Sequence, residues 1–234
     1  MGSPDKRGIG GIMNKKAIIA ISGGVDSAVV TAIVEAEGYD LYFLTVNYGQ
    51  KSFKREEDST KELSKYYKAK EHKIIDMKWL GELGHSVITS KEIQLEGNSD
   101  DIVYVPYRNT LIIAAAVAWA EVIGAEKIYT GSDAPYNGHV SLVPDNNPLY
   151  YRQVNNLVAI STKLNKNILV VAPLNHCNKD EIVKKGFELG VPFELTWTCV
   201  LNNEKACGVC PPCKDRLRAF AKNNITDQIQ YVGK

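Results

Sequence analysis

The stretch Ser22-Gly23-Gly24-Val25-Asp26-Ser27 decides the predicted fold, because of the two segments that flank it. The preceding run Ala17–Ile21 is short, apolar and β-branched, which is typical of a buried strand. The following run Ala28–Ala36 has its apolar residues at helical spacing. A strand, a glycine-rich turn and a helix in this order predict a phosphate cradle. The glycines let the backbone bend sharply, and the first helical N–H groups face an anion.

This glycine-rich turn does not match two common nucleotide motifs. No lysine follows the glycines, as a Walker A loop requires, and their spacing is not that of the dinucleotide fingerprint GxGxxG. The hexapeptide instead resembles the PP-loop, SGGxDS, of the ATP pyrophosphatase enzymes. Those enzymes cleave ATP between the α and β phosphates and pass AMP to an acceptor oxygen. An ordinary strand-to-helix turn that contains two glycines is the alternative interpretation.

Composition predicts one soluble globular domain with room for a small appendage. The chain has 234 residues, of which 44% are hydrophobic and 24% charged. A net charge of +1 gives no overall electrostatic footprint for nucleic acid, so a nucleic-acid partner is not expected. No apolar run approaches the roughly 20 residues of a membrane span. Residues 1–12 are expected to be a leader or disordered arm before the folded chain.

Strands and helices alternate along the rest of the sequence. Strands are expected at 17–21, 40–48, 72–76, 127–131 and 168–172, and helices at 28–36, 52–70, 111–123, 150–164, 179–189 and 215–222. This alternation predicts an α/β fold with a parallel five-stranded sheet and helices on both faces. The stretch from Trp79 to Asp101 is expected to contain a long loop.

Several details of individual helices follow from the sequence. Asn109 is expected to cap the helix 111–123, which is apolar almost all round and therefore expected to be buried. Leu63, Tyr66 and Tyr67 form the predicted apolar face of 52–70. Asn178 and Glu181 have the spacing of a capping box.

Three polar segments follow predicted strands directly. They are Ser22–Ser27, the tripeptide Tyr48–Gln50 and the loop from Ser132 to Pro148. In parallel α/β sheets ligands bind at the carboxyl ends of the strands. We therefore expect these segments to converge on one crevice. The domain around it is expected to span 13–175, followed by a helical, cysteine-rich region at 176–234.

Four of the five cysteines are clustered near the end of the chain, with the spacing C-x7-C-x2-C-x2-C. They are Cys199, Cys207, Cys210 and Cys213. Two-residue gaps let thiolates reach one tetrahedral ion, and four sulfurs predict structural Zn²⁺ in a reducing, cytoplasmic environment. An iron–sulfur cluster and four unrelated buried thiols are the alternatives. The fifth, Cys177, is expected to be a simple thiol.

Basic residues surround the cysteine cluster. A solvated surface is favoured for them over an RNA-binding one. They are Lys205, Lys214, Arg216, Arg218 and Lys222.

With these motifs placed, the chain resembles the 7-cyano-7-deazaguanine synthase (QueC) family from Met13 to Arg218. The resemblance rests on Ser22–Ser27, Tyr48-Gly49-Gln50, Pro106-x-Arg108-Asn109, Lys179 at a helix start, Thr198-Cys199 and the C-x2-C-x2-C knuckle. It implies a Rossmann-like sheet of the HUP, or adenine nucleotide alpha hydrolase-like, class with a C-terminal zinc-knuckle subdomain. It also implies a homodimer.

The resemblance implies an activity as well. The family converts 7-carboxy-7-deazaguanine, ammonia and ATP into 7-cyano-7-deazaguanine, the nitrile precursor of queuosine and archaeosine. The substrate carboxylate is first adenylated, and ammonia then gives an amide. A second adenylation of the amide oxygen leads to the nitrile. The leaving group is pyrophosphate, which backbone N–H groups, hydroxyls and Mg²⁺ would bind.

The resemblance also implies residue roles. ATP would be bound by Ser22, Gly23, Gly24, Val25, Asp26, Ser27, Tyr48 and Gln50; the catalytic residues would be Asp26, Ser27, Arg108 and Lys179; and substrate would contact Asp133, Asp145 and Arg108. Asp26 is the candidate to hold Mg²⁺, with capping of the following helix as its alternative role. Lys179 and Arg108 would neutralise the phosphates, with a surface role as the alternative.

Two positions depart from the family pattern. Ser52 stands where the family usually carries a histidine, and Val143–Asn146 stands where a YPDC-like segment usually reads the deazaguanine. Other functions therefore stay open. One is a related adenylating enzyme with another acceptor, such as a tRNA thiolase or an enzyme that modifies protein or DNA. Another is a nucleotide-binding zinc module without turnover.

Overall fold

The three-dimensional description comes from a computed structural model of the chain. It describes residues 15–84, 86–90, 104–133, 144–163, 167–201 and 204–233. The arm predicted at 1–12 lies outside these residues, and so does much of the loop expected within 79–101. Val143, the first residue of the segment that departs from the family pattern, lies outside them as well. Among the described helices, none is both long and apolar enough to cross a membrane.

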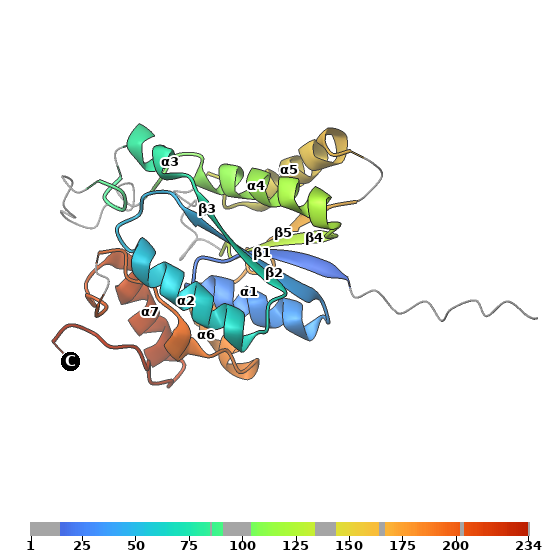
Figure 1. The fold of residues 1–234 in the computed structure, drawn as a ribbon. Helices are drawn as coiled ribbons and strands as arrows, with labels where there is room; N and C mark the ends of the chain where they lie inside the picture. The colour runs from blue at the N-terminus through green and yellow to red at the C-terminus, as the bar shows by residue number, and fades with distance from the viewer. Residues whose placement is uncertain are drawn as a thin grey trace, which may run out of the picture.

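A five-stranded parallel sheet lies at the centre, as the sequence predicts (Figure 1). Its strands are β1 (Lys16–Ala20), β2 (Asp40–Asn47), β3 (Glu71–Asp76), β4 (Lys127–Thr130) and β5 (Leu169–Val171), in the order β3-β2-β1-β4-β5. Ile18 of β1 pairs with Tyr42 on one side and with Ile128 on the other. The chain therefore builds the sheet outward from β1 in both directions, and the strand order reverses between β1 and β4. Ligands of such sheets bind at this reversal.

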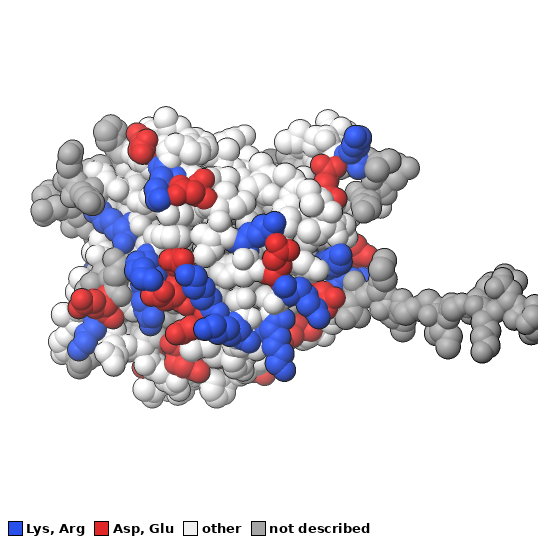
Figure 2. All heavy atoms as spheres, viewed as in Figure 1, with Lys and Arg blue, Asp and Glu red and all other residues white. Residues whose placement is uncertain are grey.

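Helices cover both faces of the sheet. One face carries α1 (Val25–Ala36), α2 (Phe53–Tyr66), α6 (Lys179–Glu188) and α7 (Pro211–Lys222), and the other carries α4 (Arg108–Ile123) and α5 (Pro148–Ser161) (Figure 1). The short α3 (Lys78–Leu83) follows β3, and a 3-10 turn spans Phe193–Leu195. Lysines and arginines alternate with acidic side chains over α2 and β3 (Figure 2).

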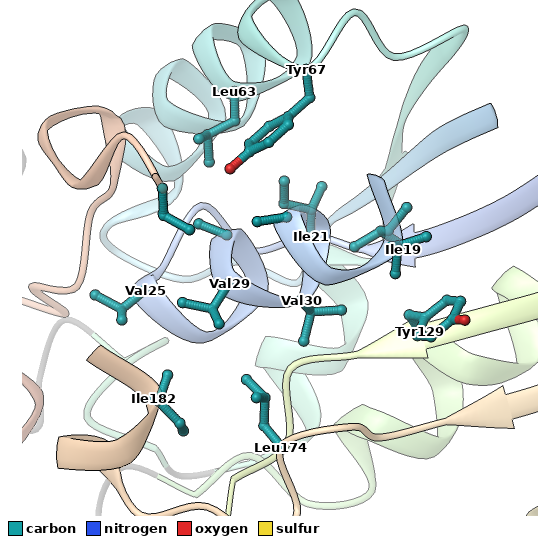
Figure 3. Packing of buried hydrophobic residues seen from close by; sticks show 14 of the residues in the cluster. Ile19, Ile21, Val25, Val29, Val30, Leu63, Tyr67, Tyr129, Leu174 and Ile182 are labelled. Carbon is teal, nitrogen blue, oxygen red and sulfur yellow. The ribbon is translucent and has the colours of Figure 1, made fainter. Parts of the chain in front are cut away.

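The larger apolar core surrounds α1. Figure 3 shows Val29 and Val30 of α1 between Ile182 of α6 and Leu63 of α2. Gly186 lets α6 approach closely, because a Cβ there would lie 2.7 Å from Cγ2 of Val29. Burial of these side chains stabilises the fold by roughly 1.5–3 kcal/mol for each large aliphatic residue.

Two smaller cores complete the packing. On the opposite face, Ile113, Trp119 and Ala120 of α4 pack against Ile18 of β1. The third core joins the four clustered cysteines to Trp197, Ala206 and Tyr231. The cysteine-rich segment therefore has little apolar area of its own.

Several sequence expectations were wrong in detail. Tyr66 is 52% exposed, and Ser59 and Thr60 are buried beside Leu63 instead, because the helix presents that side to the phosphate turn. α3 covers only the start of the stretch 79–101, so the loop expected within it stays a prediction. α7 begins at Pro211, since proline suits the first helical turn.

The helix α4 departs furthest from expectation. Its cap is Tyr107, in the left-handed region with φ +60°, and Asn109 lies inside the helix. Val122 is 81% exposed although the helix is apolar almost all round. The capping box of α6 is confirmed, with Asn178 accepting from the N–H of Glu181.

Candidate functional site

The turn between β1 and α1 has the geometry that its glycines predict. Gly23 has φ +79°, and a Cβ on it would lie 2.9 Å from Cβ of Ser59 and 3.1 Å from the carbonyl oxygen of Glu56. Gly24 precedes α1 and provides no side-chain cap. Asp26 therefore does not cap the helix. The first N–H groups of a helix have no intrahelical partner, so this helix start can bind an anion.

Two hydroxyls hold the turn together. Ser27 Oγ donates to the carbonyl of Gly24 at 3.0 Å and lies 3.3 Å from Ser22 Oγ. Ser22 Oγ in turn accepts from the N–H of Gly24 at 3.3 Å. Ser27 is buried and Ser22 is exposed. The turn is therefore organised before any ligand binds, and the hydroxyls lie where a bound phosphate could replace these weak contacts.

Gly131, directly after β4, packs closely against the turn at Ser27. A Cβ there would lie 3.0 Å from the backbone nitrogen of Ser27. Only glycine lets the end of β4 approach the start of α1 this closely. Sequence reasoning assigned no site role to Gly131, and its position at a strand end was the available signal.

A lysine lies between two carboxylates beside the turn. Nζ of Lys179, the first residue of α6, contacts the Asp26 oxygens at 2.6 and 2.7 Å and Asp133 Oδ2 at 2.9 Å. Burial raises the pKa of Asp26 to about 6, opposed by Lys179 and reinforced by Asp133. Burial lowers the pKa of Lys179, but the two carboxylates outweigh it and the net shift is upward. The structure thus places three predicted site residues in direct contact.

A second group of predicted residues lies just after the end of β2 and at the start of α4. Arg108 donates from Nη1 to Tyr48 Oη at 3.2 Å, and its guanidinium lies 5.3 Å from the centre of the Tyr48 ring. Burial raises the pKa of the Tyr48 phenol, and the nearby Arg108 lowers it by less. The hydrogen bond and the ring contact together hold the guanidinium at the start of α4.

Gln50 shapes the turn that carries Tyr48. Its Oε1 accepts from the N–H of Tyr48 at 2.9 Å, and its Nε2 donates to Glu56 Oε2 at 2.8 Å. Ser52 Oγ donates to the other oxygen of Glu56. Burial raises the pKa of Glu56, and these two donors oppose the shift. Gln50 is 4% exposed, so its direct contact with ATP stays a prediction.

The segment before α5 joins the two groups. Asp145 is buried and accepts from Asn109 Nδ2 at 3.0 Å, whereas Asn146 Nδ2 donates to the carbonyl of Asp133 at 2.9 Å. Sequence reasoning missed the roles of Asn109 and Asn146. The starts of α1, α4 and α6 are therefore linked by side-chain bonds at the carboxyl edge of the sheet, and the crevice expected there stays a prediction.

The four clustered cysteines can hold a metal. Their sulfur atoms all lie within 4.8 Å of one another, and three of the four residues are buried. Cys207 Sγ accepts from the N–H of Cys210 at 3.3 Å, and Cys199 Sγ accepts from the N–H of Cys207 at 3.4 Å. A tetrahedral ion with metal–sulfur bonds of about 2.3 Å fits such a set. The described residues thus match the predicted knuckle geometry.

One basic residue beside the cluster is not on a solvated surface. The side chain of Arg216 is 1% exposed and makes two bonds to Asp227, at 2.8 and 2.9 Å. It also donates to Thr196 Oγ1 at 2.7 Å and to Thr198 Oγ1 at 3.2 Å. The expectation for Arg216 was wrong because a buried acid from the C-terminal segment pairs with it, which the sequence pattern does not reveal.

Comparison with known proteins places the chain in a family. The model of the family "queuosine biosynthesis protein QueC" matches residues 16–224. The 7-cyano-7-deazaguanine synthase of Chlorobium phaeobacteroides (strain DSM 266) is 39% identical over 92% of this chain and 96% of that protein. The enzyme of the same name from Oceanobacillus iheyensis is 38% identical over 93% of this chain and 99% of that protein.

A solved structure of NMN synthetase from Francisella tularensis has a TM-score of 0.47 and 16% identity, covering 92% of this chain and 75% of that one. The family match spans the phosphate turn and the four cysteines, and relatives more than 35% identical align over nearly their whole length. The chain belongs to the QueC family of queuosine biosynthesis proteins.

Proposed function

We propose that the chain is an ATP-dependent ligase that converts 7-carboxy-7-deazaguanine and ammonia into 7-cyano-7-deazaguanine. One observation carries the proposal. The phosphate turn Ser22–Ser27 and the ion-paired Asp26, Lys179 and Asp133 lie together at the carboxyl edge of the sheet, in a chain of this family. The turn supplies an anion site, and the ion-paired residues supply charge beside it.

The phosphate turn binds the departing pyrophosphate. The first N–H groups of α1 and the hydroxyls of Ser22 and Ser27 face the phosphates, and Lys179 moves from its carboxylates toward them. Asp26 is a hard oxygen donor that suits Mg²⁺, so its side chain would hold the ion. Bound there, the ion would neutralise charge on the phosphate oxygens. The chain's own part in this step is to orient the α phosphate and to stabilise the leaving group.

The second group of residues binds the acceptor. Arg108 is held by Tyr48 and presents a planar fork of donors that matches a carboxylate. Asp145 and Asp133 accept from the amino and ring N–H groups of the deazaguanine. Asn109 and Asn146 hold the loop that carries these acids. Arg108 thus positions the carboxylate oxygen for attack on the α phosphorus.

The reaction consumes two ATP. A carboxylate oxygen attacks the α phosphorus and pyrophosphate leaves, giving an acyl adenylate. Ammonia attacks the acyl carbon, AMP leaves with the former carboxylate oxygen, and a proton is lost to give the amide. The amide oxygen is then adenylated by the second ATP. Pyrophosphate leaves in this adenylation as well, and loss of AMP and of the two protons that remain on nitrogen then gives the nitrile. No nucleophilic side chain is needed in this sequence.

We also propose that residues 176–234 act as a structural subdomain around zinc. Four thiolates form a closed shell without an open position, which suits a structural ion rather than a catalytic one. The stretch that carries the cysteines has only a small apolar core of its own, so the metal would stabilise it. Metal analysis of the purified chain would distinguish zinc from iron.

A homodimer completes the proposal. Apolar side chains remain exposed on both helices of the α4–α5 face, with Val122 at 81% and Ile160 at 85%. A second copy of the chain could bury them. Sedimentation of the purified protein would test this assembly, and a monomer across the micromolar range would contradict it.

The activity is tested by supplying ATP, Mg²⁺, ammonia and 7-carboxy-7-deazaguanine and measuring AMP, pyrophosphate and the nitrile mass. Formation of all three supports the proposal. AMP without the nitrile would indicate a different acceptor, which the altered segment Val143–Asn146 favours. Absence of AMP would indicate a binding module.

A further inference from the structure

Trp197 lies between the cysteine cluster and the phosphate turn and contacts both. Its backbone N–H donates to the carbonyl of Gly23 at 2.8 Å. Its indole Nε1 donates to the carbonyl of Cys199 at 2.9 Å, in a buried bond. The residue is 3% exposed and packs in the same apolar group as Cys199 and Cys213. One residue therefore links a candidate metal ligand to the glycine with φ +79° that shapes the turn.

Several further contacts hold the segment around Trp197 in place. Arg216 donates to the hydroxyls of Thr196 and Thr198, one residue before and one after Trp197. The guanidinium of Arg55 lies 5.0 Å from the centre of the Trp197 ring. A Cβ at Gly24 would lie 3.5 Å from the Trp197 carbonyl oxygen. A shift of Cys199 would therefore be passed through the Trp197 hydrogen bonds to Gly23.

We propose that Trp197 is a positioning residue that couples metal occupancy of the four cysteines to nucleotide affinity at Ser22–Ser27. The inference rests on the proposed function, which places the nucleotide on this turn. A metal held by Cys199 fixes the carbonyl that the indole binds, and the backbone of Trp197 then fixes Gly23. Coupling between two sites is reciprocal, so bound nucleotide must also retain the metal more tightly.

The wild-type protein provides the first test, which needs no variant. Zinc release from the zinc-loaded chain to TPEN, a chelator that leaves Mg²⁺ free, is followed with and without saturating α,β-methylene-ATP and Mg²⁺. We expect the nucleotide analogue to slow zinc release several-fold. Calorimetry of the same analogue establishes that it binds. Binding with unchanged zinc release would overturn the coupling alone, whereas absence of any binding would overturn the proposed function as well.

Two tryptophans form a matched pair for the second test. Trp119 is also buried and has a lysine ammonium 5.1 Å from its ring, but its indole nitrogen has no hydrogen-bond partner among the described residues. Trp197→Phe removes the bond to Cys199, and Trp119→Phe removes no such bond. We expect Trp197→Phe to weaken analogue affinity and to speed zinc release, each about five-fold, the equivalent of one hydrogen bond. Trp119→Phe should change both by less than about two-fold.

The variants separate coupling from simple loss of packing. Circular dichroism and thermal unfolding check that each variant is folded. If Trp197→Phe speeds zinc release but leaves analogue affinity unchanged, the cluster only stabilises its own segment and the proposal is wrong. Equal effects of the two substitutions would also contradict it. If Trp197→Phe does not fold, the wild-type zinc-release experiment still decides.

Discussion

Helices α1 and α4 pack on opposite faces of the same sheet, and apolar residues predominate in both. Eight of the twelve residues of α1 are buried, but only four of the sixteen in α4 are. The difference lies in what covers each helix. α6 and α2 pack over α1 (Figure 1), whereas Val122 on α4 stays exposed. Apolar composition therefore predicts burial only where another layer of the fold exists.

The starts of the two helices also differ. α1 begins after Gly23 and Gly24, and it offers bare N–H groups and the Asp26 carboxylate. α4 begins after Tyr107, which has φ +60°, and it offers the Arg108 guanidinium. Both starts lie at the same edge of the sheet. The site thus combines a backbone anion site from one face with a cationic side chain from the other.

The largest effect is expected where α6 covers α1. Ile182 is fully buried, so Ile182→Ala should lower the free energy of unfolding by about 2–5 kcal/mol, through lost burial and the cavity that remains. Urea denaturation monitored by circular dichroism would measure it. A cost below about 1 kcal/mol would mean that α6 does not pack on α1 as described.

The next effect tests the start of α1. Gly23→Ala would bring a Cβ to 2.9 Å from Ser59, in a backbone conformation that only glycine adopts readily, and should weaken α,β-methylene-ATP binding on the order of 100-fold. Gly38, at the other end of α1, is the matched control, because it also has φ +79° and a Cβ there would meet nothing within 4 Å. Gly38→Ala should cost stability but leave calorimetric affinity unchanged. Equal losses in affinity would contradict a role for the turn itself.

A pH dependence should follow from Asp26. Its raised pKa of about 6 means that the carboxylate is protonated below that value, and a metal ligand must be deprotonated. The Mg²⁺-dependent part of nucleotide affinity should fall up to about ten-fold per pH unit below about 6 and level off above it.

Calorimetry from pH 7.5 to 5 measures this dependence, with Asp26→Asn as the control that removes the pH-sensitive component. The raised pKa of Asp26 has the opposite pH effect on the folding stability of the unliganded chain. A folded-state pKa above the unfolded 3.8 makes Asp26 contribute stability as pH falls through about 6, and that contribution is lost as pH rises. A pH-independent Mg²⁺ effect would argue against Asp26 as a ligand.

The smallest effect is expected on the face that α4 and α5 share. Ile160 is 85% exposed, so Ile160→Ala should change the free energy of unfolding by less than about 0.5 kcal/mol in dilute solution. The same substitution at the buried Ile182 should cost about 2–5 kcal/mol. Repeating the denaturation at higher chain concentration sharpens the comparison. A cost that grows with concentration would show that a second copy covers this face.

The sequence predicted the elements whose signals are local. Five apolar runs alternating with helical patterns indicated the parallel sheet, and the glycines, cysteine spacing and capping box indicated the phosphate turn, the cysteine cluster and the start of α6. These features depend on residues close in the chain, because backbone conformation and ligand spacing are set by neighbours. The strand order was not predicted, since it depends on how distant segments pack.

Tertiary structure alone decided the contacts between distant residues. Lys179 meets Asp26 across 153 positions, and Arg216 is buried because Asp227 reaches it from the C-terminal segment. Trp197, which sequence reasoning passed over, lies between the cysteine cluster and Gly23. Burial, charge pairing and close approach depend on neighbours in space. The sequence by itself therefore determined the turn and the cluster, and only the folded chain determined which side chains surround them.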